Sequence, residues 1–489
     1  MRKPNKNIRL KELALLAIGF SAATGCKSSE ADQEKRNTGD PNILFVMVDD
    51  MGYSDIGIYG QDAYDTPNLD EMAAQGMRFT QAYSGSSVSA PARSTLMTGL
   101  HMGHTQVRGN TGGIPLPNEA TTIAETLQKD GYAVGGFGKW GLGDLNTEGV
   151  PEKQGFDTFY GYYHQIHAHY YYPEYLINTG KKDYLPNNSN FYDNQENLQG
   201  GIPNRENGKE LKYSHYLIFN KMTQWIRDHQ DEKFFCYAPL TPPHARYEIP
   251  KTDPAWQAVK DKPWSTNAKV HAAFNILIDR NMGELFDLLK DLGLEKETIV
   301  MFCSDNGASH RFDNSLESSG ALRGNKKTMY EGGIRVPFIA RWPGHIKPGT
   351  VSDLPVYFPD IYPTFANLAD IPVQKKTDGI SFLPEMLGNN QEQKKHDYMY
   401  WELPTYNWGK HEYTGSFQRA VRHGQWKLLR HAGDAHWELY NLQEDPGETN
   451  NLAGKHPEIV EEMTRWVDKN REAMPPQPEP EMPEGKMYR

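Results

Sequence analysis

The chain has 489 residues, of which 37% are hydrophobic and 24% are charged, and its formal net charge is −11. A chain of this length can bury one large core or two smaller ones. The acidic balance argues against nucleic acid as a general partner, although a local cationic pocket can still take an anionic substrate. After residue 30 no run is long and apolar enough to span a bilayer. The composition therefore predicts a globular protein of enzyme size.

The N-terminal segment is typical of an export signal. Basic residues precede a short apolar run, Leu13 to Ala23, which is too short for a membrane helix. The run closes on small residues before Cys26, as in a bacterial lipobox, whose cysteine is lipidated and becomes the new N-terminus. We expect a lipoprotein signal peptide over residues 1–26 and a tether over residues 27–40, with export to the periplasm or cell surface. A plain signal peptide cleaved nearby is the alternative.

Strand-like and helix-like segments alternate from residue 42 to residue 368. Asn42 to Val48 is a continuous apolar run that ends at Asp49, which indicates a strand buried on both faces. The alternation predicts an α/β fold with a large mixed, mostly parallel sheet flanked by helices. The other predicted strands are Tyr132 to Phe137, Lys233 to Ala238, Thr298 to Ser304 and Arg335 to Trp342; the predicted helices are Pro67 to Met77, Ala90 to Met97, Thr121 to Asp130, His215 to Asp228, Val270 to Leu292 and Pro359 to Leu368.

The pattern changes near Gly379, where short strand-like pieces with tight turns precede one closing helix. This predicts a main domain over residues 41–378 and a small antiparallel C-terminal subdomain over residues 379–489. Residues 143–213 are polar and aromatic with few regular elements, which is typical of a functional or mobile segment. The predicted C-terminal strands are Tyr398 to Glu402, Arg419 to Val421, Trp426 to Arg430 and Trp437 to Tyr440, and the helix is Pro457 to Asn470.

Carboxylates follow two of the buried strands. Asp49 and Asp50 come directly after the first, and Asp305 and Asn306 follow Thr298 to Ser304. In an open α/β sheet, ligands bind beyond the carboxyl ends of the strands. Clustered carboxylates require a cation, and hard oxygen ligands suit Ca²⁺ or Mg²⁺. Ordinary turn chemistry would explain either pair alone, but not both together with the motif described next.

The run Ser89-Ala90-Pro91-Ala92-Arg93 begins a predicted helix. A helix N-terminus presents backbone N–H groups and positive potential to an anion. Arg93 lies one turn further on and can project towards the same point, and Pro91 is tolerated in the first turn. The turn therefore indicates an oxyanion site, with an ordinary helix salt bridge as the alternative role for Arg93.

This run, continued to Thr98-Gly99, resembles the signature of the type I sulfatases, whose fold is alkaline phosphatase-like. In that family the first residue of the signature is oxidised after translation to formylglycine (3-oxoalanine), the catalytic nucleophile. The resemblance implies that Ser89 is oxidised by a maturation enzyme that accepts serine, as in bacteria. It also implies a Ca²⁺ ion held by Asp49, Asp50, Asp305, Asn306 and an oxygen of modified Ser89.

Further cations match the family pattern. Lys139, in Gly-Lys-Trp-Gly-Leu-Gly, resembles the sulfate-binding lysine of the family's Gly-Lys-Trp-His-Leu-Gly, but Gly141 stands where the histidine usually is. His244 follows the middle strand, and Lys326 lies five residues before a Glu-Gly-Gly motif. The resemblance, which covers roughly residues 42–470, implies catalytic roles for Ser89, Arg93, Lys139, His244 and Lys326.

Two of these assignments have competitors. Lys327, adjacent to Lys326, competes for the lysine role, and His101 or His104 could take the role of the histidine that is absent at position 141.

In the family, one hydroxyl of the hydrated aldehyde attacks sulfur, the alcohol departs, and the second hydroxyl then expels sulfate. This is covalent catalysis with its own release step. Arg93, Lys139, Lys326 and Ca²⁺ would spread the charge on the sulfuryl oxygens, and His244 or Lys326 would protonate the leaving alcohol.

The aromatic segment Tyr160 to Tyr172 is the best candidate for substrate specificity, because rings stack on sugar faces and histidines bond hydroxyl groups. Its alternative is a packed aromatic insertion without a ligand. A sulfated glycan of galactose or N-acetylgalactosamine type is the expected partner. The predicted substrate-binding residues are His101, Arg108, His164, His167 and His169, with Asn110 a weaker candidate.

Two other functions compete with this one. A phosphodiesterase or phosphonate hydrolase of the alkaline phosphatase superfamily shares the sheet and the carboxylates, but usually holds two Zn²⁺ ions with several histidines. A non-catalytic glycan-binding lipoprotein is the third possibility, and Gly141 is its only support.

Overall fold

The structure is a computed structural model that describes residues 40–192, 199–206, 208–309, 312, 314–373 and 376–477. The predicted signal peptide, with Cys26, and the tether up to residue 39 lie outside the described residues. From residue 40 onward the chain forms one compact unit. Within the described ranges, no helix has both the length and the apolar character needed to cross a membrane.

A ten-stranded sheet organises this unit. Its five central strands are parallel and buried, and antiparallel strands join both edges, so the predicted mixed, mostly parallel sheet is confirmed. In order across the sheet the strands are β15 (Thr350–Ser352), β2 (Met77–Phe79), β14 (Phe338–Arg341), β13 (Thr298–Ser304), β1 (Asn42–Val48), β11 (Phe234–Leu240), β4 (Ala133–Lys139), β5 (Thr158–Tyr162), β6 (Tyr175–Asn178) and β7 (Lys181–Tyr184).

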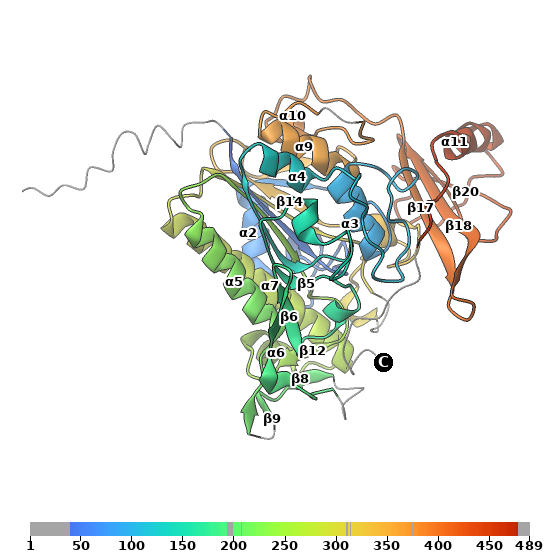
Figure 1. Ribbon diagram of the computed structural model, residues 1–489. Helices are drawn as coiled ribbons and strands as arrows, with labels where there is room; N and C mark the ends of the chain where they lie inside the picture. The colour runs from blue at the N-terminus through green and yellow to red at the C-terminus, as the bar shows by residue number, and fades with distance from the viewer. Residues whose placement is uncertain are drawn as a thin grey trace, which may run out of the picture. The chain divides into compact units, whose positions relative to one another are not determined.

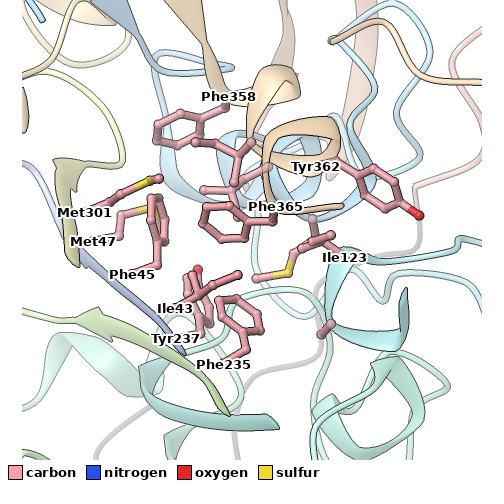
Figure 2. Packing of buried hydrophobic residues seen from close by; sticks show 14 of the residues in the cluster. Ile43, Phe45, Met47, Ile123, Phe235, Tyr237, Met301, Phe358, Tyr362 and Phe365 are labelled. Atoms are coloured by element: carbon pink, nitrogen blue, oxygen red, sulfur yellow. The ribbon is translucent and has the colours of Figure 1, made fainter. Parts of the chain in front are cut away.

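Strand β1 shows why both faces of the sheet are covered. Alternate side chains point to opposite faces of a strand, and Ile43, Phe45 and Met47 belong to one buried cluster while Leu44 and Val46 belong to another. Figure 2 shows the first set packed with aromatic side chains from β11 and from the helix that begins at Ile361.

Helices cover the two faces in separate groups (Figure 1). Helices α3, α4 and α9 contribute to the cluster around Phe45, and helices α2, α5 and α7 contribute to the cluster around Leu44. Most helix ends lie within a few residues of those predicted. The helices are α2 (Pro67–Gln75), α3 (Ser89–Thr98), α4 (Ile123–Lys129), α5 (Ser214–Asp228), α7 (Thr266–Asp291) and α9 (Ile361–Leu368).

The C-terminal region forms the predicted four-stranded antiparallel sheet with one helix (Figure 1). One face of this sheet packs on Met463 and Val467 of the helix. The other face packs on Tyr83 and Tyr357, which lie outside the C-terminal region. The domain boundary at residue 378 stays a prediction. The elements are β17 (Met399–Asn407), β18 (Glu412–His423), β19 (Trp426–Arg430), β20 (Glu438–Asn441) and α11 (Pro457–Lys469).

Three predictions of local structure are corrected. The hairpin β17–β18 extends well beyond the short strands predicted, because its distal residues pair with each other and leave the apolar core. Residues 335–337 of the predicted strand Arg335 to Trp342 do not join β14, which begins at Phe338 after the helical turn Glu331–Ile334. Residues 158–184 supply three strands of the main sheet. The remaining short elements are α6 (Pro254–Val259), α8 (Glu331–Ile334), α10 (Leu383–Met386), β3 (Ala82–Tyr83), β8 (Gly200–Ile202), β9 (Arg205–Glu206), β10 (Lys209–Glu210), β12 (Glu248–Pro250) and β16 (Val356–Tyr357).

Candidate active site

Strand pairing places the four predicted metal ligands together. Val48 pairs with Ser304, so the residues that follow β1 and β13 leave the sheet side by side. The Asp305 amide donates to Val48 O at 2.9 Å, and the Asp50 amide donates to the Asp305 carboxylate at 3.2 Å. Asp49, Asp50, Asp305 and Asn306 are all at most 1% exposed.

Ser89, at the first position of α3, meets this cluster. Its hydroxyl donates to Asp49 Oδ1 at 3.1 Å and lies 3.4 Å from Asn306 Oδ1. Burial and the nearby Asp49 carboxylate raise the pKa of Asp305, which shows that this space disfavours a full set of negative charges. The donors are all oxygens, the set that Ca²⁺ prefers, so the residues present fit a calcium ion.

Arg93 and Lys139 face the same carboxylates. Arg93 Nη2 lies 3.2 Å from Asp49 and 2.9 Å from Asp305, and its Nη1 donates to Lys139 O. Lys139 Nζ lies 2.5 Å from Asp49 Oδ2. Burial opposes ionisation of Asp49, but Lys139, His244 and Arg93 outweigh it and hold the pKa of Asp49 well below its ordinary value. The aspartate is therefore an anion ready to bind a cation.

Lys326 and His244 approach from the other side, beside Asp50. Lys326 Nζ lies 2.6 Å and 2.8 Å from the two carboxylate oxygens of Asp50, and His244 Nε2 lies 3.6 Å from the same side chain. The His244 ring stacks on His169, with ring centroids 4.4 Å apart. Burial and Lys326 lower the pKa of His244 well below its ordinary value.

A cavity of about 290 Å³ opens beside these groups. Trp408, in the turn of the β17–β18 hairpin, stands at its margin with 62% of its surface exposed. Lys327, the predicted competitor of Lys326, also faces the cavity. The lining residues are Asp50, Ser89, Asn110, Thr111, Lys139, Gln165, Ile166, His169, His244, Ala245, Ser309, Lys326, Lys327 and Trp408.

Two predicted substrate-binding residues, Arg108 and His101, lie outside this lining. Arg108 is 1% exposed. Its guanidinium forms an ion pair with Glu402 at 3.1 Å and donates hydrogen bonds to backbone carbonyls. His101 is buried, its Nδ1 accepts from the Gly103 amide, and its ring stacks on His104. His104 bonds to Asp378 at 2.8 Å, and neither histidine lines the cavity.

Two more of the predicted histidines, His164 and His167, also lie outside the lining. His164 is 1% exposed, and its Nδ1 accepts from the Ile166 amide at 3.0 Å. His167 packs between Tyr162 and Tyr175 in the core. Of the five predicted substrate-binding residues, His169 alone lines the cavity, and the tyrosines Tyr171 and Tyr172 of the aromatic segment are packed in a buried cluster.

Sequence reasoning missed several lining residues. Gln165 lies inside the aromatic segment but carries no motif, and Trp408 follows a strand whose outer half was not predicted. Thr111 and Ser309 lie on loops, where spacing carries little information. An exposed tryptophan between two polar strands was the one usable signal.

The fold and the site together are those of an alkaline phosphatase-like hydrolase, with a serine hydroxyl at a helix N-terminus beside converging carboxylate and amide oxygens. Comparison with known proteins narrows this class. The sulfatase family model matches residues 41–371, and the model of the N-sulphoglucosamine sulphohydrolase C-terminal region matches residues 324–473. The chain belongs to the sulfatase family and is a sulfuric ester hydrolase.

Individual relatives agree with this assignment. Human arylsulfatase A is 33% identical over 464 residues, covering 86% of both chains. The N-acetylgalactosamine-6-O-sulfatase of Bacteroides thetaiotaomicron is 28% identical over 95% of this chain and 99% of its own. The solved structure of Ps i-CgsB in complex with k-i-k-neocarrahexaose has a TM-score of 0.72 at 26% identity, and the match covers 88% of this chain and 94% of that one. The predicted family is therefore confirmed.

Proposed function

We propose that this protein hydrolyses sulfate esters on carbohydrates, using formylglycine derived from Ser89 and a calcium ion. One observation carries the proposal: the Ser89 hydroxyl lies 3.1 Å from Asp49 and 3.4 Å from Asn306, at the start of a buried helix that aims Arg93 at the same carboxylates. Oxidised Ser89 would supply the nucleophile and the means of releasing sulfate. The calcium ion would supply charge neutralisation to the nucleophile and the sulfuryl oxygens.

The chain's own residues divide the remaining work. Asp49, Asp50, Asp305 and Asn306 would hold the metal, since their oxygens converge beside Ser89. Arg93, Lys139 and Lys326 bring fixed positive charge to the point where the sulfuryl group gains negative charge. His244 and Lys326 line the cavity beside Asp50, and one of them would protonate the leaving alcohol.

The cavity favours a sugar as the alcohol part of the substrate. An exposed indole at the margin of a polar cavity is suited to stack on the apolar face of a sugar ring. His169 and Asn110 offer hydrogen bonds to ring hydroxyl groups. Because relatives are named for N-acetylgalactosamine-6-sulfate, we propose a sulfated galactose or N-acetylgalactosamine unit of a glycan.

The test is sulfate release by protein co-expressed with a Ser-type maturation enzyme. The substrates are 6- and 4-sulfated galactose and N-acetylgalactosamine, 4-nitrophenyl sulfate, and a phosphonate monoester as the competing activity. We expect release from a sulfated sugar that Ser89→Ala abolishes. Turnover of the phosphonate alone would contradict the proposal, and so would glycan binding without turnover by protein in which Ser89 is oxidised.

We also propose that the mature chain is an exported lipoprotein anchored through Cys26. The support is the basic and apolar leader that ends at this cysteine. Membrane fractionation with Cys26→Ala tests it. The wild-type protein should sediment with membranes and the variant should not carry lipid; an unlipidated wild-type protein would contradict the proposal.

A further inference from the structure

Gln165 lies beside Gly141, next to the charged cluster. The Trp140 and Gly141 amides donate to Tyr162 O and Tyr163 O at 2.8 Å and 2.9 Å, which extends the pairing of β4 and β5 beyond both strands. The chain after Tyr163 is thereby held against Gly141. A Cβ atom added to Gly141 would lie 3.8 Å from Gln165 Cβ, 3.5 Å from Arg93 Cδ and 4.0 Å from Lys139 Cε.

The orientation of the Gln165 amide follows from its one bond. Its Nε2 donates to Asn110 O at 3.0 Å, and because a carbonyl oxygen can only accept, the nitrogen must face Asn110. Oε1 is then the amide atom that is left to accept a hydrogen bond. It is buried without a hydrogen-bond partner among the described residues, in a side chain that is 5% exposed. A buried acceptor without a donor costs free energy, so a group that donates to it is expected in the working site.

Asn110 ties Gln165 to the nucleophile. The Asn110 side chain accepts from the amide of Ala90, the residue after Ser89, at 3.0 Å. The same residue therefore holds the first turn of α3 through its side chain and Gln165 through its backbone carbonyl. Gln165 and Ser89 both line the cavity, so the two residues border the same space.

We propose that Gln165 Oε1 accepts a hydrogen bond from a hydroxyl group carried by oxidised Ser89. The inference rests on the proposed function and adds one residue to it. An amide neither gains nor loses a proton near neutral pH, so Gln165 orients the nucleophile without titrating. Arg93 and Lys139 offer donors only, which leaves Gln165 as the acceptor on this side of the nucleophile.

The test compares Gln165→Leu, which keeps most of the volume but removes the acceptor, with Gln128→Leu as a control at a partly exposed helix position. Mass spectrometry of the Ser89 peptide gives the oxidised fraction, by which all rates are divided. Rates are measured on a sulfated N-acetylgalactosamine and on 4-nitrophenyl sulfate, which lacks sugar hydroxyl groups. We expect Gln165→Leu to lower kcat about 100-fold on both substrates, with KM within about threefold.

A second readout does not need turnover. Methoxyamine reacts with the carbonyl form of oxidised Ser89 in the folded protein. Loss of the hydrogen bond disfavours the hydroxylated form, so we expect Gln165→Leu to react several-fold faster than the wild type. Gln165→His, which can place an acceptor in the same region, should restore part of the wild-type behaviour in both assays.

Three results would overturn the inference. A loss confined to the sugar substrate and to KM would mean that Oε1 bonds a substrate hydroxyl instead. Unchanged kcat and unchanged methoxyamine labelling in Gln165→Leu would mean that the oxygen has no partner on Ser89. Sulfate release by wild-type protein whose Ser89 peptide has lost no hydrogens would refute the proposed function itself, and this inference with it, so the two failures are distinguishable.

Discussion

At the scale of single residues, the site is a balance of buried charges. Asp49, Asp50 and Asp305 share a space with Arg93, Lys139 and Lys326, and each carboxylate lies within 3.2 Å of at least one of these cations. Buried charges are tolerated when they are paired, and the cations in turn are aimed at an anion that enters the cavity. The loss of activity on removing one cation should therefore depend on whether that cation faces the anion in the cavity.

Lys326 and its neighbour Lys327 provide a matched comparison. Lys326 is paired with Asp50, and burial and the carboxylates together leave its pKa above the ordinary value, so it stays charged. We predict that Lys326→Met lowers kcat/KM about 100- to 1,000-fold, because one charge facing the sulfuryl group is lost. Lys327→Met should cost less than about tenfold. Steady-state kinetics on both variants decide the matter, and equal losses would contradict the assignment of the catalytic lysine.

The residues that were predictable are those fixed by regular structure. Asp49, Asp50, Asp305 and Asn306 follow strands recognisable from apolar runs, and Ser89 and Arg93 lie one helical turn apart. Side chains placed by loops were less predictable. His101 and Arg108 follow α3 closely in the chain, but the His101 backbone amide bonds to Asp378 and the Arg108 side chain to Glu402, contacts that no local pattern encodes.

At the scale of elements, the C-terminal sheet completes the site. Tyr413 of β18 lies 3.3 Å from the hydroxyl of Thr111, a cavity residue, and the turn after β17 carries Trp408. The predicted short strands stop before this part of the hairpin, because its polar and aromatic residues pack on each other rather than on the core. The hairpin therefore joins the recognition of substrate to the position of the C-terminal sheet.

Trp408 should affect sugars and not simple aryl esters. Loss of one stacking contact costs about 1 kcal/mol, or roughly fivefold in KM. We predict that Trp408→Ala raises KM for the sulfated sugar by about this factor and leaves kcat nearly unchanged. Tyr184→Ala is the control, since Tyr184 is equally exposed at 66% but lies on β7, outside the cavity lining. A kcat defect without a KM change would argue against stacking.

A buried cluster of three charged side chains connects the C-terminal sheet to the helical turn α8. Lys427 of β19 lies 2.8 Å from Glu331 and 2.8 Å from Glu448, and all three side chains are fully buried. Lys427→Met would leave Glu448 without its cation and Glu331 with Arg335, at 3.4 Å, as its ion-pair partner, at a cost of about 3–5 kcal/mol. Chemical unfolding should show this loss, whereas Lys410→Met on the exposed hairpin should change the stability by less than about 0.5 kcal/mol. A stable Lys427→Met protein would show that this cluster does not hold the C-terminal sheet to α8.

At the scale of the whole molecule, buried neutral histidines make stability depend on pH. Burial lowers the pKa of His215 to about 4, while in the unfolded chain it is near 6.5. Between these values the unfolded state binds more protons, so stability is fully present above about pH 6.5 and is lost as the pH falls towards 4. Burial lowers the pKa of His101 to about 4 as well, with the same sign.

His215→Gln tests this linkage. Glutamine can still donate to Asn281 Oδ1, which His215 contacts at 2.7 Å, but it cannot be protonated. The wild-type free energy of unfolding should fall from pH 7 to pH 5, and in the variant this fall should be smaller by about 2 kcal/mol. Denaturant titrations at the two pH values measure both. An equal fall in the two proteins would mean that His215 is not buried as a neutral side chain.

The fold could be predicted at this scale because its central strands are continuous apolar runs, such as Asn42–Val48 and Thr298–Ser304, and each is buried on both faces. The edge strands could not. β6 and β7 lie in a polar, aromatic stretch, and β7 exposes most of its side chains, so their hydrophobic pattern carries no signal. These two strands are stabilised by pairing, β6 with β5 and β7 with β6.

The central claim is that Ser89 acts only after oxidation. The most direct measurement pairs the mass of the Ser89 peptide with sulfate release, across preparations in which the amount of co-expressed maturation enzyme is varied. We predict that the Ser89 peptide loses two hydrogens in matured protein. Sulfate release should rise in proportion to the oxidised fraction and should be zero where no Ser89 is oxidised. Sulfate release that is independent of this fraction, or present with unmodified Ser89, would contradict the account.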